Sequence, residues 1–239
     1  MEAFTLQLAD IPIGVSCSYH STKEYCADYL TDVEPAFSVT VSETDCMAER
    51  RFMKESCSLP YLELLALYRK ICERLVAYNI ILMHGSAIAV DGQVYIFIAL
   101  SGTGKSTHTA FWREYLVPRG HEVVMVNDDK PLIAVNDKGI FACGTPWSGV
   151  HRLSANLSLP VKAICILERA QKNSIVSISP DEVFPVLYQQ TYRPENPLLL
   201  TNILTLLGKL KHSVSFYRLG CTPSIDAAQT AYNTMKQGD

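Results

Sequence analysis

The most informative stretch of this chain is a glycine-containing segment, Ala99-Leu100-Ser101-Gly102-Thr103-Gly104-Lys105-Ser106-Thr107. The apolar run Val94–Leu100 leads into it, and residues 105–116 follow with a pattern typical of a helix. Two glycines allow a tight turn whose backbone N–H groups face inward. The following helix adds the positive end of its dipole. The segment therefore predicts a strand–loop–helix unit that binds a polyphosphate through residues 101–107.

Two side chains of this loop carry further expectations. Lys105 is expected to reach the β and γ phosphates, and the Ser106 hydroxyl to ligate a magnesium ion. The phosphate-loop consensus G-x-x-x-x-G-K-[ST] begins with glycine, and here Ala99 occupies that position. Alanine fits there if its φ is negative. The expected cofactors are ATP and Mg²⁺, against the alternative of a glycine-rich turn that binds nothing.

Three polar residues near the loop in sequence are candidates for the same site. His84 is expected on the preceding strand, and Asp128 and Asp129 follow the apolar run Glu122–Val126. A carboxylate at the end of a neighbouring strand is where phosphate-loop enzymes hold their metal. Because adjacent strand residues point to opposite faces, both aspartates reach the site only if the strand has ended. The alternatives are a core histidine and a solvated strand end.

A second glycine-containing loop, Gly144–Gly149, follows another predicted strand. After it comes Arg152, which is either a planar donor that neutralises phosphate charge or a surface residue. Trp147 is either a stacking partner for a ligand or, as we favour, a buried anchor. Arg193 lies in a predicted loop that is able to approach the site, whereas Arg169 is expected to be structural.

The pattern of apolar runs indicates an α/β fold. Residues 1–58 hold short apolar runs and are expected to form a small β-rich N-terminal segment, and residues 59–239 to form a separate domain built around the phosphate loop. Two turns, Asp91-Gly92 and Asn136–Gly139, predict hairpins, so the sheet is expected to be mixed. Helices are expected at residues 59–79, 105–116, 180–190, 197–211 and 224–236.

Composition excludes several classes of protein. The 239 residues carry a net charge of −3 without clusters of lysine or arginine, so we expect no nucleic-acid partner. No run of eighteen apolar residues predicts a membrane span, and Met1–Asp10 does not resemble a signal peptide. The eight cysteines include no C-x-x-C pair, which argues against a zinc site. A cytoplasmic location with reduced thiols is therefore expected.

Taken together, these motifs resemble a known family. His-Gly at 84–85, Ser-Gly-x-Gly-Lys-Ser at 101–106 and Asp-Asp at 128–129 are similar to the catalytic domain of HPr kinase/phosphorylase. That fold is related to phosphoenolpyruvate carboxykinase, whose loop also reads Ser-Gly-Thr-Gly-Lys. The resemblance covers roughly residues 80–169 and implies a mixed-sheet phosphate-loop kinase core. It does not cover residues 1–58.

The resemblance also implies roles for the candidate residues. Asp128 would act as general base on an acceptor hydroxyl, and Asp129 would contact the metal. His84 would hydrogen-bond the catalytic aspartate and orient it. The assignment of the two aspartates stays open at this point.

The chain departs from the family in two places. The family has a Glu-x-x-Gly element whose glutamate supports the metal, and here Phe141 occupies that position before Gly144. The family's later loop for recognising the carrier protein HPr is not recognisable. The Gly-Thr-Pro-Trp-Ser-Gly loop is closer to the carboxykinase side. HPr is therefore not the expected substrate, and no motif supports phosphorylase activity, whose presence stays open.

The sequence thus favours an ATP- and Mg²⁺-dependent kinase that transfers the γ-phosphate to a hydroxyl group. The acceptor would be a serine of a protein or peptide, or a small molecule. Two alternatives are a nucleotide-responsive binding module without phosphoryl transfer and a carboxykinase-like enzyme. The residues leave the oligomeric state open, a homo-oligomer included.

Overall fold

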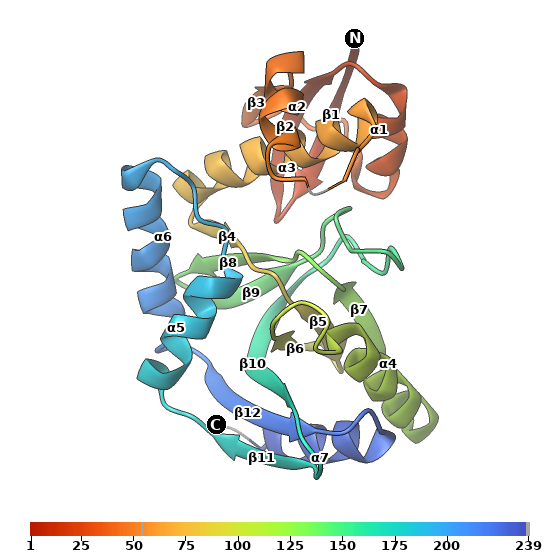
Figure 1. The fold of residues 1–239 in the computed structure, drawn as a ribbon, viewed down its shortest axis with the longest axis vertical. Coiled ribbons are helices and arrows are strands. Elements are labelled where there is room, and N and C mark those ends of the chain that lie inside the picture. The colour runs from red at the N-terminus through yellow and green to blue at the C-terminus, as the bar shows by residue number, and fades with distance from the viewer. Residues whose placement is uncertain (54, 238–239) are drawn as a thin grey trace. The chain divides into compact units, whose positions relative to one another are not determined.

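The computed structural model describes residues 1–53 and 55–237 and divides into two compact units, Met1–Tyr78 and Asn79–Asp239 (Figure 1). The N-terminal unit holds a three-stranded sheet in the order β1-β2-β3. β1 and β2 are antiparallel, and β2 and β3 are parallel. Its elements are β1 (Glu2–Leu8), β2 (Ile11–Cys17), α1 (His20–Tyr25), η1 (Ala27–Tyr29), β3 (Phe37–Thr40), α2 (Glu43–Arg50), α3 (Leu59–Leu75) and η2 (Val76–Tyr78).

Helix α3 belongs to the N-terminal unit, so the boundary between the units follows Tyr78, whereas the sequence pattern predicted it after residue 58. The helix begins after Ser58, whose side chain accepts a hydrogen bond from the Tyr61 N–H, and it packs against α1, α2 and β3. Its Glu63 is buried and accepts hydrogen bonds from the backbone of Ser18 and from the Thr22 hydroxyl, at 2.7 and 2.6 Å. Because these contacts join α3 to the N-terminal sheet and α1, the compact unit extends to Tyr78.

The second unit contains a mixed sheet, as expected. Among the described residues nine strands follow the path β4-β8-β9-β10-β6-β5-β7, with β12 beside β10 and β11 beside β12. The strands are β4 (Ile80–Leu82), β5 (Ser86–Val90), β6 (Gln93–Ile98), β7 (Val123–Asn127), β8 (Leu132–Asn136), β9 (Gly139–Cys143), β10 (Ser158–Arg169), β11 (Ser174–Ser177) and β12 (Ser215–Cys221).

Strand β10 organises this sheet. It pairs in parallel with β6 and β12, and its first residues pair antiparallel with β9. The carboxyl ends of β6, β10 and β12 therefore meet at one edge, which is where ligands bind in open α/β sheets. The expected hairpins are confirmed: β5 and β6 are joined by Asp91 and Gly92, which both have positive φ, and β8 pairs with β9.

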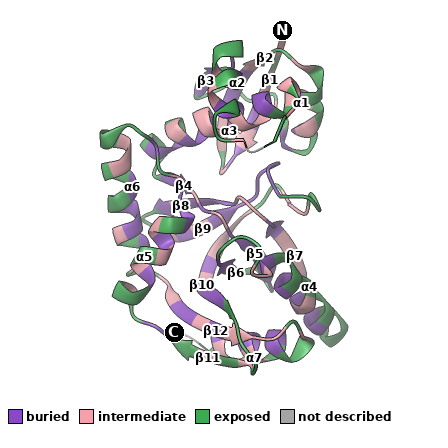
Figure 2. Ribbon diagram, viewed as in Figure 1, coloured by how far each residue is buried: buried purple, intermediate pink, exposed green. Residues whose placement is uncertain are grey.

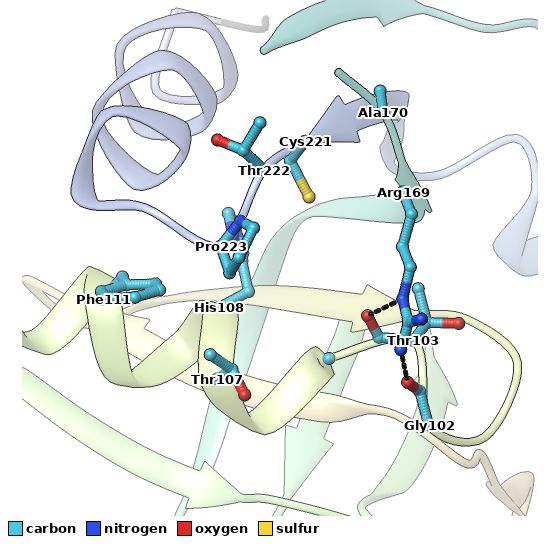
Figure 3. A pocket seen from close by; sticks show the side chains of 11 residues that line it. Gly102, Thr103, Thr107, His108, Phe111, Arg169, Ala170, Cys221, Thr222 and Pro223 are labelled. Carbon is cyan, nitrogen blue, oxygen red and sulfur yellow. Dashed lines mark hydrogen bonds between the residues drawn. The ribbon is translucent and has the colours of Figure 1, made fainter. Parts of the chain in front are cut away.

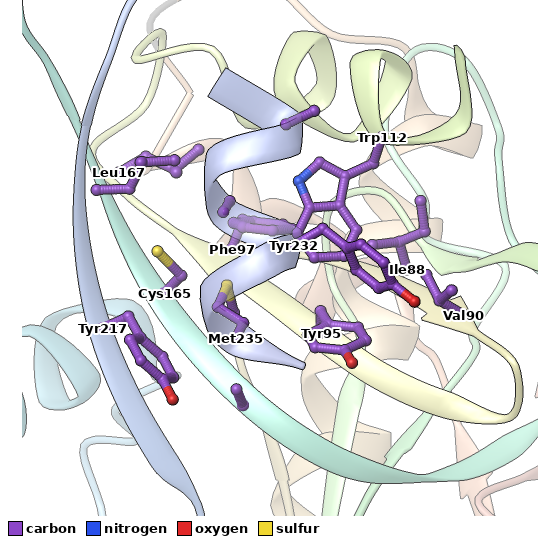
Figure 4. Packing of buried hydrophobic residues seen from close by; sticks show 14 of the residues in the cluster. Ile88, Val90, Tyr95, Phe97, Trp112, Cys165, Leu167, Tyr217, Tyr232 and Met235 are labelled. Atoms are coloured by element: carbon purple, nitrogen blue, oxygen red, sulfur yellow. The ribbon is translucent and has the colours of Figure 1, made fainter. Parts of the chain in front are cut away.

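Helices cover the sheet and enclose an aromatic core. Helix α4 (Lys105–Leu116) packs against α7 (Ile225–Met235), and α5 (Pro180–Gln190) packs against α6 (Pro197–Leu210) (Figure 1). Trp112 is fully buried, with its ring centroid 5.0 Å from those of Tyr95 and Phe97 and 5.5 Å from that of Tyr232 (Figure 4). Buried residues run along β5 and β6, the strands that lead into the glycine loop (Figure 2). No helix in the described part of the chain is long and apolar enough to cross a bilayer.

Two glycines provide a test of the packing. A Cβ atom on Gly144 would lie 1.8 Å from the Ala155 carbonyl oxygen and 2.8 Å from that of Val126. We expect Gly144→Ala to lower the free energy of unfolding by about 3 kcal/mol, because backbone must move to relieve the overlap. Urea denaturation followed by circular dichroism measures this change.

Gly208 is the matched control. It lies in helix α6, and no atom outside its own helix lies within 4 Å of the position of an added Cβ. Gly208→Ala should raise the free energy of unfolding by roughly 0.5–1 kcal/mol, the usual gain for a helical position. Equal stability of the two alanine variants would contradict the packing described for Gly144.

Candidate functional site

The glycine loop has the geometry expected of a phosphate cradle. Gly102 and Gly104 have φ values of +77° and +116°, and no atom beyond their chain neighbours lies within 4 Å of an added Cβ at either position. Glycine is therefore required by backbone conformation, and the space inside the turn is open. Ala99 does not have a positive φ, so it meets the condition for replacing the consensus glycine. Helix α4 begins at Lys105 without a side-chain cap at Gly104.

Lys105 folds back over the loop. The residue is 8% exposed, and its Nζ donates to the carbonyl oxygen of Ala99 at 3.2 Å. Burial lowers the pKa of Lys105, and the charges of Asp129 and Asp128 oppose this effect. The structure thus brings the loop lysine within electrostatic range of both aspartates.

Asp128 is connected to the first turn of α4 by a buried relay of hydroxyl groups. It is 6% exposed, and its Oδ1 accepts from Ser86 Oγ at 2.6 Å. Ser86 Oγ lies 3.0 Å from Thr109 Oγ1, which also bonds the backbone oxygens of Lys105 and Ser106. The relay therefore places Asp128 on the side of the site that holds Ser106. No role was predicted for Ser86. A hydroxyl group in an otherwise apolar, fully buried strand is the pattern that could have indicated one.

His84 was expected to contact one of the two aspartates, and the one it contacts is Asp129. His84 Nε2 lies 3.3 Å from Asp129 Oδ1. His84 is also not on a strand, because β4 ends at Leu82 and β5 begins at Ser86. In this break the Gly85 N–H donates to the Asp129 carbonyl oxygen at 3.0 Å, which holds the histidine beside residue 129.

Asp129 is an ionised and partly exposed carboxylate. Its side chain is 29% exposed, and Lys130 Nζ lies 3.9 Å from Oδ2. Burial acts to raise its pKa, but the hydrogen bond from His84 and the charges of Lys130, His84 and Lys105 outweigh burial, so the pKa lies below its ordinary value. Asp129 is therefore available as a proton or metal acceptor at neutral pH.

Asn127 positions both aspartates and was not expected to do so. Its fully buried amide accepts at Oδ1 from the N–H groups of Asp129 and Lys130, at 2.9 and 2.7 Å. Nδ2 donates to the carbonyl and hydroxyl oxygens of Thr145, at 3.0 and 2.9 Å. One side chain thus closes the turn after β7 and ties it to the second loop. The sequence pattern that could have indicated this role is an asparagine at the end of a strand, because asparagine side chains often hydrogen-bond the backbone of a following turn.

The second loop lies against this turn. Trp147 is 4% exposed, which agrees with the expected buried anchor. An added Cβ on Gly149 would lie 3.2 Å from Asp129 Cβ, so the end of the loop adjoins that carboxylate. Arg152 is exposed and has φ +50°, and its N–H donates to the Gly149 carbonyl oxygen at 3.3 Å. Its role at the phosphates stays a prediction.

Two other arginines have structural contacts. Arg169 donates to the carbonyl oxygens of Gly102 and Thr103 and so holds the glycine loop in place. Arg193 donates to the carbonyl oxygens of Tyr188 and Gln189 and therefore caps the end of α5. The sequence left open whether Arg193 approaches the site. In the structure its side chain contacts the end of α5 instead.

Two cavities flank the loop. One, of about 470 Å³, lies between the loop with the start of α4 and the connection from β12 to α7 (Figure 3). The other, of about 380 Å³, lies between the loop and α5 and includes Gln190 and Arg218. Thr103 and Arg169 line both.

The donor set is compatible with magnesium bound together with a nucleotide. Among the described residues no group of three or more histidine, cysteine or acidic side chains forms a metal site. Mg²⁺ commonly takes one or two carboxylates and completes its shell with phosphate oxygens and water. Asp128, Asp129 and the Ser106 hydroxyl supply oxygen ligands of this kind, so the residues present fit a metal that arrives with phosphates.

Comparison with known proteins does not assign the chain to a family. No protein-family model matches the chain, and no curated protein matches it. Among solved structures, the Hpr(Ser) kinase/phosphatase from Coxiella burnetii matches with 12% sequence identity and a TM-score of 0.36. The match covers 65% of this chain and 91% of that chain. Similarity of this size does not establish a shared activity.

The role assigned to Asn127 is testable without a ligand. We expect Asn127→Ala to lower the free energy of unfolding by about 3 kcal/mol, because it leaves buried polar groups of the turn and of Thr145 without their partner. Urea denaturation monitored by tryptophan fluorescence measures the change.

Asn136 is the control for this substitution. Its Oδ1 accepts from the Lys138 N–H at 2.9 Å in an exposed hairpin turn. Asn136→Ala should cost only about 0.5 kcal/mol, since water replaces the lost bond. A similar loss of stability in both variants would remove the special position given to Asn127.

Proposed function

We propose that this chain is an ATP- and Mg²⁺-dependent kinase that transfers the γ-phosphate to a hydroxyl group of a protein, a peptide or a small molecule. The observation that carries the proposal is the convergence of an open glycine cradle, a buried lysine and two carboxylates from a separate strand end. A phosphoryl-transfer site requires this combination of phosphate donors, metal ligands and a proton acceptor.

The loop residues Ser101–Thr107 would bind the phosphates. The peptide planes of the loop are fixed because Arg169 holds the carbonyl oxygens of Gly102 and Thr103. Lys105 now donates to a neutral carbonyl oxygen, and a charged phosphate oxygen is a stronger acceptor. Phosphate binding is therefore expected to turn Lys105 toward the nucleotide, and Arg152 is a further candidate to neutralise charge.

The contacts favour a division of labour between the aspartates that reverses the one implied by the family resemblance. The hydroxyl relay places Asp128 beside the turn that holds Ser106, so we assign these two residues to the metal. Mg²⁺, when bound, would neutralise charge on the β and γ oxygens. Asp129 is more exposed and contacts His84, so we assign it as the general base, with His84 as the positioning residue.

The reaction then follows from these positions. The acceptor oxygen forms a bond to the γ-phosphorus as the bond to the β-bridging oxygen breaks and ADP leaves. The acceptor proton passes to the Asp129 carboxylate late in this step. The low pKa of Asp129 keeps it ionised before the reaction. Positioning and charge neutralisation supply most of the acceleration.

One observation favours a second candidate, a nucleotide-responsive binding module. Phe141 of β9 occupies the place where the related family has a metal-supporting glutamate. Loss of that ligand would weaken transfer without preventing nucleotide binding. In this module ATP would order the loops for a partner, and no phosphate would move.

Substitution of the three charged residues tests the proposal. Lys105→Ala should abolish transfer, and Asp129→Asn should lower kcat by a factor of about 10²–10⁴ with little change in the Kd for Mg-ATP. Asp128→Asn should raise the Mg²⁺ concentration needed for half-maximal rate. Transfer of label from γ-³²P-ATP to a library of serine-containing peptides measures the rates, and calorimetry measures binding.

Asp137→Asn, in the exposed turn between β8 and β9, is the control and should behave as the unaltered protein. Full activity of Lys105→Ala would reject the assigned site. Binding of Mg-ATP without transfer to any acceptor would favour the binding module. Failure of both Mg-ATP and Mg-ADP to bind at millimolar concentration would reject both candidates.

A further inference from the structure

The cavity of about 470 Å³ adjoins the glycine loop, but the proposed catalytic residues do not line it. Gly102–Gly104 and the first turns of α4 line one side, and Ala170 with Cys221–Pro223 lines the other (Figure 3). His84, Asp128 and Asp129 do not line it. A nucleotide with its phosphates on the loop would therefore place its non-reacting end in this cavity. Its volume lies in the usual range for small-molecule sites, about 300–1,000 Å³.

His108 presents a hydrogen-bond donor to this cavity. The residue is 4% exposed, and its Nε2 accepts from the indole N–H of Trp112 at 3.0 Å. Because an indole nitrogen only donates, Nε2 carries no proton, and the proton of the neutral ring lies on Nδ1.

The Nδ1–H group is left for a ligand. It makes no hydrogen bond within residues 1–53 and 55–237, and it is not among the fully enclosed polar atoms without a partner. It is therefore reached from the cavity that His108 lines. Two other polar side chains that line the cavity are already engaged: Arg169 donates to the glycine loop, and the Thr222 hydroxyl lies 3.1 Å from Asn173 Oδ1.

The walls of the cavity suit a flat ring. Phe111 of α4 and Pro223 of the β12–α7 connection both line it and are seen with His108 in Figure 3. Aromatic and prolyl faces bind planar bases by stacking and burial of apolar area. A two-ring base buries more of this area than a one-ring base, and its ring nitrogens accept hydrogen bonds.

We propose that this cavity binds the purine base of the nucleotide and that His108 Nδ1–H donates to a ring nitrogen of that base. The assignment rests on the proposed function and adds to it a purine preference. His108 is then a specificity-determining residue, and Trp112 acts through it by holding the ring in one tautomer.

Two substitutions distinguish the role of the Nδ1 donor of His108 from that of its Nε2 acceptor. His108→Asn places an amide N–H near the position of Nδ1 but loses the acceptor for Trp112. His108→Gln places an amide oxygen near the position of Nε2 and keeps that acceptor but loses the donor in the cavity. The first variant should therefore keep purine affinity with a lower Tm, and the second should keep the Tm with reduced purine affinity.

Calorimetry with Mg-ATP, Mg-GTP, Mg-UTP and Mg-tripolyphosphate measures the effect. The unaltered protein should bind both purine nucleotides more tightly than UTP or tripolyphosphate. In His108→Gln the Kd for Mg-ATP should rise about five- to tenfold, the usual size of one hydrogen bond, while the Kd for tripolyphosphate stays unchanged. An equal loss of affinity for tripolyphosphate would overturn the assignment.

Alkylation of Cys221 by iodoacetamide gives a test in the unaltered protein. Cys221 lines the cavity, and Cys57 in the N-terminal unit serves as the internal reference. Mg-ATP should slow alkylation of Cys221 more than Mg-tripolyphosphate does. Equal protection by both, or equal affinity for all four ligands, would overturn the purine subsite and leave the kinase proposal intact. Failure of every polyphosphate to bind would overturn both.

Discussion

The buried amide of Asn127 is the contact on which the candidate site depends most. Its oxygen closes the turn that carries Asp128 and Asp129, and its nitrogen holds the loop that begins at Gly144. A carboxamide suits this position because it donates and accepts without carrying a charge next to two carboxylates. The two aspartates consequently leave the end of β7 in different directions. One meets the hydroxyl of Ser86 and the other meets His84.

Charge balance then decides the state of the site. Lys105 is buried, and burial alone favours its neutral form, but two carboxylates nearby favour the charged form. The lysine thus sits close to acidic groups, and its Nζ is held by a backbone oxygen at the start of the loop. An arriving polyphosphate would bring negative charge to the same place, where a metal ion is needed to offset the aspartates. Phosphate and metal are therefore expected to bind together.

One hydrogen bond, from Trp112 to His108, connects the aromatic core to the cavity beside the glycine loop. Trp112 is packed among Phe97, Tyr95 and Tyr232, so its indole N–H has a fixed direction. That direction fixes the proton of His108 on Nδ1, the nitrogen that we propose donates to a ligand in the cavity. Packing far from the phosphates thereby determines which hydrogen-bond donor a ligand meets. The same helix presents its first turn to the loop, so a single element joins the two ends of the proposed nucleotide site.

The sequence by itself determined the features that depend on neighbouring residues: the loop at 99–107, helix α4, the hairpin at Asp91-Gly92 and hence the mixed sheet. Glycines, turn residues and apolar spacing act over a few positions, so they can be interpreted without the fold. Only the tertiary structure decided that His84 contacts Asp129, that Ser86 and Asn127 support the aspartates, that Arg193 caps α5, and that α3 belongs to the N-terminal unit. Each of these depends on strand register, on a break between β4 and β5, or on packing across segments distant in sequence. Apolar periodicity predicts which residues are buried, but it does not specify the side chain that each one meets.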